Sequence, residues 1–170
     1  MLLYYPQFLA SDEADELFAV LRDRTAWAGD RVVRPAVPAA DGVYADDGVV
    51  YRYSGVAHAA VSWPDYLRPV RQRRGDGRGG VNSLLLNYYR DGRDSIGYHA
   101  DDEPELGVNP VVPSLSLGAT RRFLLRHTRT GERLAFDLPH GSLLIMAGTV
   151  QHHYRHAVPK TTRPVGRASI

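Results

Sequence analysis

The stretch NYYRDGRDSIGYHADDE, from Asn87 to Glu103, contains the most informative feature of this chain, the tripeptide His99-Ala100-Asp101. In an extended strand, residues i and i+2 point to the same side, so both side chains can reach one ion. His156 offers the second imidazole of a set that holds non-heme Fe(II) on one face and leaves the other face open. The spacing alone is only suggestive, because 7 histidines give many chance pairs.

Two further blocks lie downstream, PSLSLGATRRFLLRH from Pro113 to His127 and HGSLLIMAGTVQHHYRHAVPK from His140 to Lys160. With these blocks the chain resembles the AlkB family of iron and 2-oxoglutarate dependent dioxygenases, closest to the branch that repairs alkylated DNA. The shared patterns are N-x-Y-x-D-G-x-D-x-I-G-x-H-x-D-D-E, S-x-S-x-G and H-G-S-L-L-x-M, in that order. The resemblance runs from about Tyr51 to the end of the chain, whereas the N-terminal third matches poorly.

The resemblance implies a catalytic metal site made of His99, Asp101 and His156. The choice of the second imidazole needs a separate argument, because strand alternation leaves both His152 and His156 eligible. In the family, the ligand directly precedes a segment like Ala-Val-Pro-Lys, and this favours His156. We interpret His152 and His153 as exposed or supporting residues. The remaining histidines discussed, His58 and His127, are interpreted as structural or surface residues.

The resemblance also implies a pocket for 2-oxoglutarate. Asn87 and Tyr89 match the family's Asn-x-Tyr, whose side chains bind this co-substrate, and Arg167 matches the arginine that pairs with its distal carboxylate. A planar guanidinium gives a carboxylate two parallel hydrogen bonds. The family has a second arginine shortly afterwards, beyond Ile170, and Ser169 stands where many members have Asn. We therefore expect the natural gene to continue, with an arginine at about the third position after Ile170.

Recognition of a damaged base is implied for a further group of residues. The family's second acid reaches the exocyclic amine of the base and its glutamate supports the pocket, which assigns these roles to Asp102 and Glu103. Without the resemblance, an Asp-Asp-Glu run is more often a solvated turn. Tyr51, Tyr53 and Ser54 resemble the family's aromatic-x-aromatic-Ser-Gly. Alternation puts both tyrosines on one side of a strand, where they could stack on an extruded base or simply pack on the core.

The pattern of elements predicts a mainly β protein with flanking helices. A helix is predicted from an N-cap at Ser11, with an apolar face around Phe18 and Leu21, and a second helix near Pro64. Short strands separated by Gly, Pro and Asp turns favour a sandwich or jelly roll over alternating βαβ units. The strands are predicted at Val81–Tyr89, Val111–Leu117, Arg122–His127, Arg133–Asp137, Ser142–Ala147 and His153–Ala157, with a last one from Arg167. The family resemblance implies the double-stranded β-helix, a jelly roll that holds iron in its mouth.

At 170 residues, the chain is predicted to form one dioxygenase domain. Residues 1–80 would supply the N-terminal helices and a nucleotide-recognition lid, with a loop-rich segment from Arg31 to Gly48, and residues 81–170 the jelly-roll core. Cysteine is absent, which excludes disulfides, thiolate metal sites and a cysteine nucleophile. No long apolar run or leader is evident, so we expect a soluble, cytoplasmic monomer without a membrane partner.

Basic residues are almost all arginine, since Lys160 is the single lysine among 21 Lys and Arg. Arginine favours planar contact with phosphate, although a GC-rich genome would give the same bias. Arg121 and Arg122 could meet phosphate or face water. A cluster between Arg68 and Arg78 could track phosphates or be a solvated helix end.

The resemblance implies oxidative demethylation of N-alkylated bases, such as 1-methyladenine and 3-methylcytosine, as direct-reversal repair of DNA. Fe(II) would use 2-oxoglutarate and O2 to hydroxylate the N-methyl group, with release of succinate, CO2 and then formaldehyde. Two alternatives stay open. One is an oxygenase of the same kind acting on RNA, protein or a small molecule, and the other is a non-catalytic nucleic-acid-binding relative. Demethylation in a duplex would require the target base to leave its stack.

Overall fold

The computed structural model describes residues 1–25, 27, 40–46, 51–53, 56–58, 62–67, 71 and 81–162. Its helical elements are α1 (Ser11–Arg24), η1 (Asp65–Leu67), η2 (Pro104–Leu106) and α3 (Val150–His153). Its strands are β1 (Leu2–Tyr5), β2 (Ala40–Ala45), β3 (Tyr51–Tyr53), β4 (Val56–His58), β5 (Ser83–Tyr88), β6 (Ile96–His99), β7 (Val112–Ser116), β8 (Arg121–His127), β9 (Arg133–Leu138), β10 (Ser142–Met146) and β11 (Tyr154–Val158). The described part of the chain is therefore mainly β with flanking helices, as predicted. None of its helices is long and apolar enough to cross a membrane.

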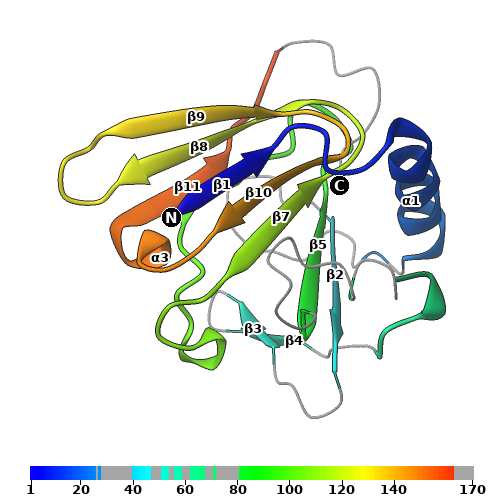
Figure 1. Cartoon of the computed structure of the whole chain (residues 1–170), viewed down its shortest axis with the longest axis horizontal. Coiled ribbons are helices and arrows are strands. Elements are labelled where there is room, and N and C mark those ends of the chain that lie inside the picture. The colour runs from blue at the N-terminus through cyan, green and yellow to red at the C-terminus, as the bar shows by residue number, and fades with distance from the viewer. Residues whose placement is uncertain are drawn as a thin grey trace.

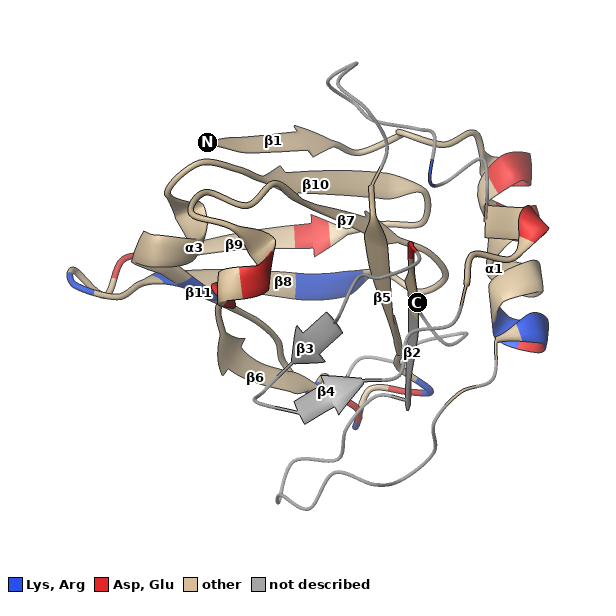
Figure 2. Ribbon diagram, turned by 90° about the horizontal axis from the view of Figure 1, so that it is seen from below, with Lys and Arg blue, Asp and Glu red and all other residues tan. Residues whose placement is uncertain are grey.

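Two antiparallel sheets carry the architecture. One has the order β1-β10-β7 and the other β6-β11-β8-β9, while β2 pairs with β5 and β3 with β4. Helix α1 stands at one end of the strands of both larger sheets, and α3 stands at the opposite end (Figures 1 and 2). Apart from the β8–β9 hairpin, the neighbours within these two sheets are distant in sequence, which is the strand order of a jelly roll and not of a simple meander.

The core between the two larger sheets is built by alternation. Phe123 and Leu125 of β8 share one apolar cluster with Leu144 and Met146 of β10, which belongs to the facing sheet. The other face of β10 carries Leu143 and Ile145, which pack in a separate cluster with Leu3 and Leu115. All five residues of β10 are buried. Because the strand has apolar neighbours on both faces, its sequence SLLIM is a continuous apolar run and does not alternate.

The His140-Gly141-Ser142 block forms the turn that enters β10. Gly141 has φ +75°, and a Cβ there would lie 3.1 Å from the Leu9 carbonyl oxygen, so only glycine fits without strain. His140 Nδ1 accepts the Gly118 N–H at 2.8 Å, and the Ser142 hydroxyl donates to the Pro139 carbonyl at 2.7 Å. Backbone geometry accordingly explains this block, with no need for a catalytic role.

The predicted strands are confirmed with boundaries shifted by one or two residues, except that the strand from Arg167 and part of the predicted lid lie outside the described residues. The list of predicted strands lacks five that the structure describes: β1, β2, β3, β4 and β6. Residues 40–45 of β2 fall within the segment predicted as loop. The jelly-roll core was predicted to comprise residues 81–170, but β1 also belongs to its sheets, because it pairs with β10. These strands are short, and three to six residues give periodicity little to act on.

The N-terminal helix is confirmed, but its predicted cap is wrong. Ser11 is the first helical residue, and Ala10 is the N-cap, with no side-chain hydrogen bond. Boundary shifts of this size are common where several polar residues precede a helix. Phe18 and Leu21 face inward as expected and pack with Tyr44 of β2 and Leu86 of β5. Near Pro64 the described residues form only the short η1, and Pro69 lies outside them.

Candidate metal centre and active-site cavity

Strand pairing brings His99 and His156 together. His99 is the last residue of β6, and His156 is the third residue of β11, and the two are direct cross-strand partners in an antiparallel pair. Directly opposed residues project from the same face of a sheet. Here that face is the interior, because Phe123 and Leu125 of the neighbouring β8 are both buried in the core between the sheets. The two imidazole rings lie with their centroids 4.2 Å apart.

Asp101 completes a compact group. One of its carboxylate oxygens lies 3.8 Å from His99 Nε2, and the other lies 3.5 Å from His156 Nε2. The three potential ligand atoms all lie within 4.8 Å of one another, and no second group of this kind occurs among the residues that the structure describes. The structure therefore assembles the same three residues that the sequence motif predicted, from segments more than fifty positions apart.

The protonation states favour a cation between these groups. Burial lowers the pKa of His156 to about 3, and the neighbouring His99 adds to the effect, so its imidazole is neutral near pH 7. Burial also raises the pKa of Asp101, which reflects the cost of a carboxylate held there without a counter-charge. His99 Nδ1 donates to the Gly97 carbonyl oxygen at 2.9 Å, and its Nε2 lies on the side of Asp101. Two imidazoles and a carboxylate are a ligand set that fits Fe(II).

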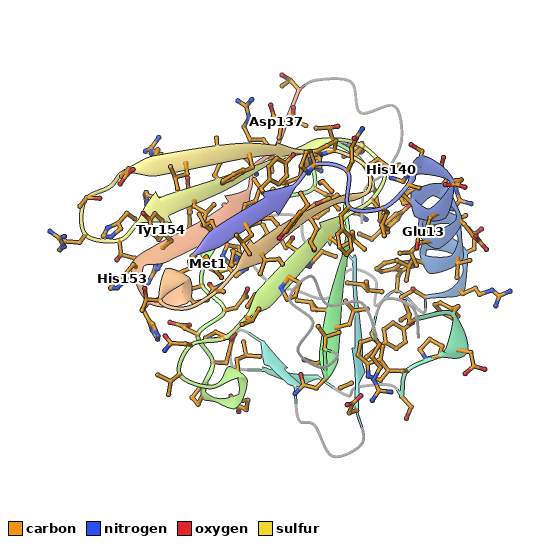
Figure 3. All side chains as sticks on the ribbon, in the orientation of Figure 1. Met1, Glu13, Asp137, His140, His153 and Tyr154 are labelled. Atoms are coloured by element: carbon orange, nitrogen blue, oxygen red, sulfur yellow. The ribbon has the colours of Figure 1, made fainter. Side chains whose placement is uncertain are left out.

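The other nearby histidines are engaged elsewhere. His152 lies in α3 with Nε2 against the carbonyl of Val108 and the side chain of Asn109. His153 is at the α3 end of the molecule beside Tyr154 (Figure 3), where its ring stacks on that of His127. The alternation argument that left His152 eligible fails because the strand begins only at Tyr154, after the helical turn. His156, the residue chosen by the resemblance, is the one that the fold brings to Asp101.

A cavity of about 970 Å³ adjoins this group. His99, Asp101 and His156 line it, and so do Asn87 and Tyr89, the two residues predicted to bind 2-oxoglutarate. Asn87 projects from β5, and Tyr89 follows that strand directly and is buried. The structure thus places both predicted co-substrate residues in the same cavity as the metal group. Arg167, the predicted carboxylate clamp, lies outside the described residues, as does Ser169.

The residues predicted to recognise the base are only partly placed. Asp102 is exposed and Glu103 is half-buried, and neither lines the cavity. Instead, Glu105 and Leu106 of the following η2 line it. Tyr51 and Tyr53 belong to β3, which pairs with β4 through the partners Tyr51–His58 and Tyr53–Val56. Ser54 lies outside the described residues. The substrate roles of this group remain predictions.

Arg121 is a functional candidate that the sequence analysis misread. It is only 7% exposed and lines the cavity, so it does not face outward from the protein surface. Its guanidinium donates to three backbone carbonyls, of Asp91, Asp94 and Pro159, and lies 4.9 Å from the centre of the Tyr89 ring. Strand alternation could have revealed this, because Arg121 shares its side of β8 with the buried Phe123 and Leu125.

The adjacent Arg122 points the other way and forms a bidentate ion pair with Asp137 on the exposed face. Two more residues of the metal group's surroundings were also missed. Phe123 stacks on the His156 ring at a centroid distance of 5.3 Å, and the buried Gln151 contacts the Asp101 backbone. A lone Phe or Gln in a strand or helix has no sequence signature that separates such a role from ordinary packing.

Comparisons with known proteins identify the family to which this chain belongs. The family model of the 2OG-Fe(II) oxygenase superfamily matches residues 1–168, so the chain belongs to that superfamily. Within it, the chain belongs to the AlkB family. DNA oxidative demethylase ALKBH2 of Mus musculus is 33% identical over 171 residues, which cover 91% of this chain and 72% of the mouse protein. Alpha-ketoglutarate-dependent dioxygenase alkB homolog 3 of Rattus norvegicus is 36% identical over 171 residues.

The chain spans only part of some relatives, covering 57% of the rat protein and 62% of bovine ALKBH2. A solved structure of OsALKBH1 superimposes with a TM-score of 0.62 over 94% of this chain and 85% of the other, at 20% sequence identity. This likeness confirms the jelly-roll fold. The family implies Fe(II), with 2-oxoglutarate and O2 as co-substrates, and His99, Asp101 and His156 are the residues that would hold the metal.

Proposed function

We propose that this protein removes alkyl groups oxidatively from the ring nitrogens of DNA bases, of the 1-methyladenine and 3-methylcytosine type. The observation that carries the proposal is the group of half-buried His99 and Asp101 and buried His156, beside a cavity lined by Asn87 and Tyr89. The relatives named DNA oxidative demethylase ALKBH2 support a DNA substrate for this chain.

The proposed reaction divides the work between the bound groups and the chain. Fe(II), when bound, would activate O2, the oxidant that hydroxylates the N-methyl carbon while 2-oxoglutarate is converted to succinate and CO2. The hydroxymethyl group then leaves as formaldehyde: its O–H proton is released to solvent, and the electron pair of the broken C–N bond returns to the ring nitrogen and neutralises the cationic base. The chain holds the metal, aims the methyl group and excludes water. The apolar strands around the cavity serve the last task, and the proposed Asn87 and Tyr89 contacts orient the co-substrate.

A basic row on the sheet supports a nucleic-acid substrate. Arg126 of β8 is the direct cross-strand partner of Arg155 in β11 and of Arg133 in β9. The three arginines therefore stand side by side on the face opposite Phe123 and Leu125, across about 10 Å of sheet. Like charges directly opposite one another are destabilising. Within the described part of the chain, no ion pair of these three arginines is found, and only Arg126 has an aromatic partner, the Tyr98 ring at 4.6 Å. A phosphate backbone would relieve this repulsion.

The reaction is tested with a short oligonucleotide that contains one 1-methyladenine or 3-methylcytosine. We expect loss of one methylene by mass, with matching amounts of formaldehyde and succinate, only when Fe(II) and 2-oxoglutarate are both supplied. The control is His99→Ala, which should bind the oligonucleotide and leave its mass unchanged. Turnover on a methylated peptide with an unchanged oligonucleotide would contradict the DNA proposal and favour a protein substrate.

The basic row is tested separately through the salt dependence of binding. Arg155→Gln should weaken binding of unmodified DNA and reduce the slope of log affinity against log salt concentration by about 0.9, the amount expected for one phosphate contact. Arg22→Gln is the matched control, because this exposed arginine lies in α1 and already pairs with Asp23. An unchanged slope in Arg155→Gln would remove the row from the nucleic-acid interface.

A further inference from the structure

Gln151 is a buried polar residue that the proposed reaction does not use. It lies in α3 and is 2% exposed. Both ends of its side-chain amide have partners. The carbonyl oxygen accepts the backbone N–H of Asp101 at 3.0 Å, and the amide nitrogen lies 3.7 Å from the sulfur of Met146. The first contact joins residues 50 positions apart in sequence.

The Asp101 backbone depends on this contact. Strand β6 ends at His99, and residues 100–103 take no part in a strand ladder. A backbone N–H withdrawn from water needs another acceptor, and here the Gln151 amide takes the place that a neighbouring strand would have held. Without it, the backbone of Ala100 and Asp101 beyond the end of β6 would have no hydrogen bond that directs the carboxylate toward His156.

Gln151 also connects the two segments that carry the ligands. It lies five positions before His156, at the helical turn that leads into β11, and its partner Asp101 is the carboxylate of the same group. The antiparallel pairing of β6 and β11 fixes His99 against His156 but leaves Asp101 outside the ladder. We propose that Gln151 is a positioning residue of the metal centre, whose carbonyl fixes the Asp101 backbone and thereby sets the 3.5 Å separation of the Asp101 carboxylate and His156 Nε2.

An ordinary packing role does not explain the residue. Its surroundings include the fully buried Met146, so an apolar side chain of similar length would fill the space without the cost of burying an amide. The hydrogen bonds of the Gln151 amide offset this cost, and the stronger of the two is the one to the Asp101 backbone. This inference rests on the Fe(II) centre of the proposed function but not on its substrate, so inactivity on methylated DNA would leave it standing.

The test measures metal affinity directly. The full chain is stripped of metal with a chelator and titrated with Co²⁺, and binding is followed by calorimetry and by the cobalt absorption spectrum. Gln151→Met removes the acceptor for Asp101 while it keeps the length of the side chain. We expect it to bind Co²⁺ about 10–100-fold more weakly, the usual consequence of losing a group that orients a metal ligand. Gln151→Glu keeps an oxygen toward Asp101 and should bind Co²⁺ more tightly than Gln151→Met.

Met146→Leu is the matched control, because it removes the sulfur at the other end of the amide and leaves the Asp101 contact in place. It should bind Co²⁺ with nearly wild-type affinity. Wild-type affinity in Gln151→Met, or equal weakening in Met146→Leu, would overturn the proposal. If Gln151→Met does not fold, hydrogen exchange in the metal-free wild type decides the matter. The Asp101 amide should be protected, and exchange at the rate of an unstructured residue would overturn the assignment.

Discussion

Arg121 and Arg122 are adjacent in sequence and offer a direct test of what burial does to an arginine. Arg121 is 7% exposed and donates to the carbonyls of Asp91, Asp94 and Pro159 at 3.2, 2.8 and 2.9 Å. It therefore ties the loop after β5 to the end of β11. We expect Arg121→Met to destabilise the protein far more than Arg122→Met, although the two changes are chemically identical.

The magnitude follows from the contacts. Hydrogen bonds from a charged donor are each worth about 1.5–3 kcal/mol. The stacking on Tyr89 adds about 1 kcal/mol. Removing the guanidinium also removes the cost of burying its charge, so the sum is an upper bound. The carbonyls of Asp91, Asp94 and Pro159 are neutral, and a buried acceptor left without a donor costs about 1–3 kcal/mol, so that three of them at the low end of this range cost about 3–5 kcal/mol. Arg122 forms an exposed pair with Asp137, and such pairs contribute about 1 kcal/mol or less.

The assay is urea unfolding of the metal-free full chain, followed by circular dichroism, with the slope of the transition checked for constancy between variants. A loss of about 3–5 kcal/mol in Arg121→Met is a large part of the 5–15 kcal/mol typical of a folded domain. A variant that is partly unfolded without urea would agree with this estimate. A loss below about 1 kcal/mol, or equal losses in both variants, would refute the burial argument.

Three further predictions concern the site and the loop beside it. His156→Ala should abolish Co²⁺ binding and turnover, whereas His152→Ala should retain both. Titration of the two variants with Co²⁺ measures the difference. The reverse pattern would identify His152 of α3 as the metal ligand. Asp102→Ala should slow demethylation of an oligonucleotide much more than substrate-independent decay of 2-oxoglutarate. The lost charge-assisted contact should raise the barrier to demethylation by about 1.5–3 kcal/mol. Equal losses of both activities would place Asp102 at the metal or co-substrate instead. Burial raises the pKa of Asp94, but hydrogen bonds from Arg90 outweigh this and lower it overall. The ionised Asp94 should therefore contribute fully to the free energy of unfolding above the ordinary pKa of about 3.9, and this contribution should disappear as the pH falls through the lowered pKa. Asp94→Asn should accordingly show a weaker dependence of the free energy of unfolding on pH between pH 6 and about pH 2. An unchanged dependence would contradict the assignment.

The sequence determined most of the strands through local patterns, whereas the metal group was identified through the family resemblance that its motifs carry. His99 and Asp101 are two residues apart, but Asp101 lies beyond the end of β6, so strand alternation alone does not place its carboxylate. The two-residue spacing of Phe123 and Leu125 puts both on the inner face of β8. The choice of His156 over His152 needed the family resemblance, since periodicity could not show that a helical turn separates His152 from β11.

Only the tertiary structure decided which residues support the site. The short strands β1 and β2 have almost no periodic signal, and they form because β10 and β5 offer them edges to pair with. Gln151 meets Asp101 across 50 positions of sequence, and the three carbonyls that Arg121 holds come from two separate segments. Local sequence sets which face a side chain takes and what chemistry it offers. Which partner it finds depends on contacts between distant segments, and these exist only once the sheets have closed around the core.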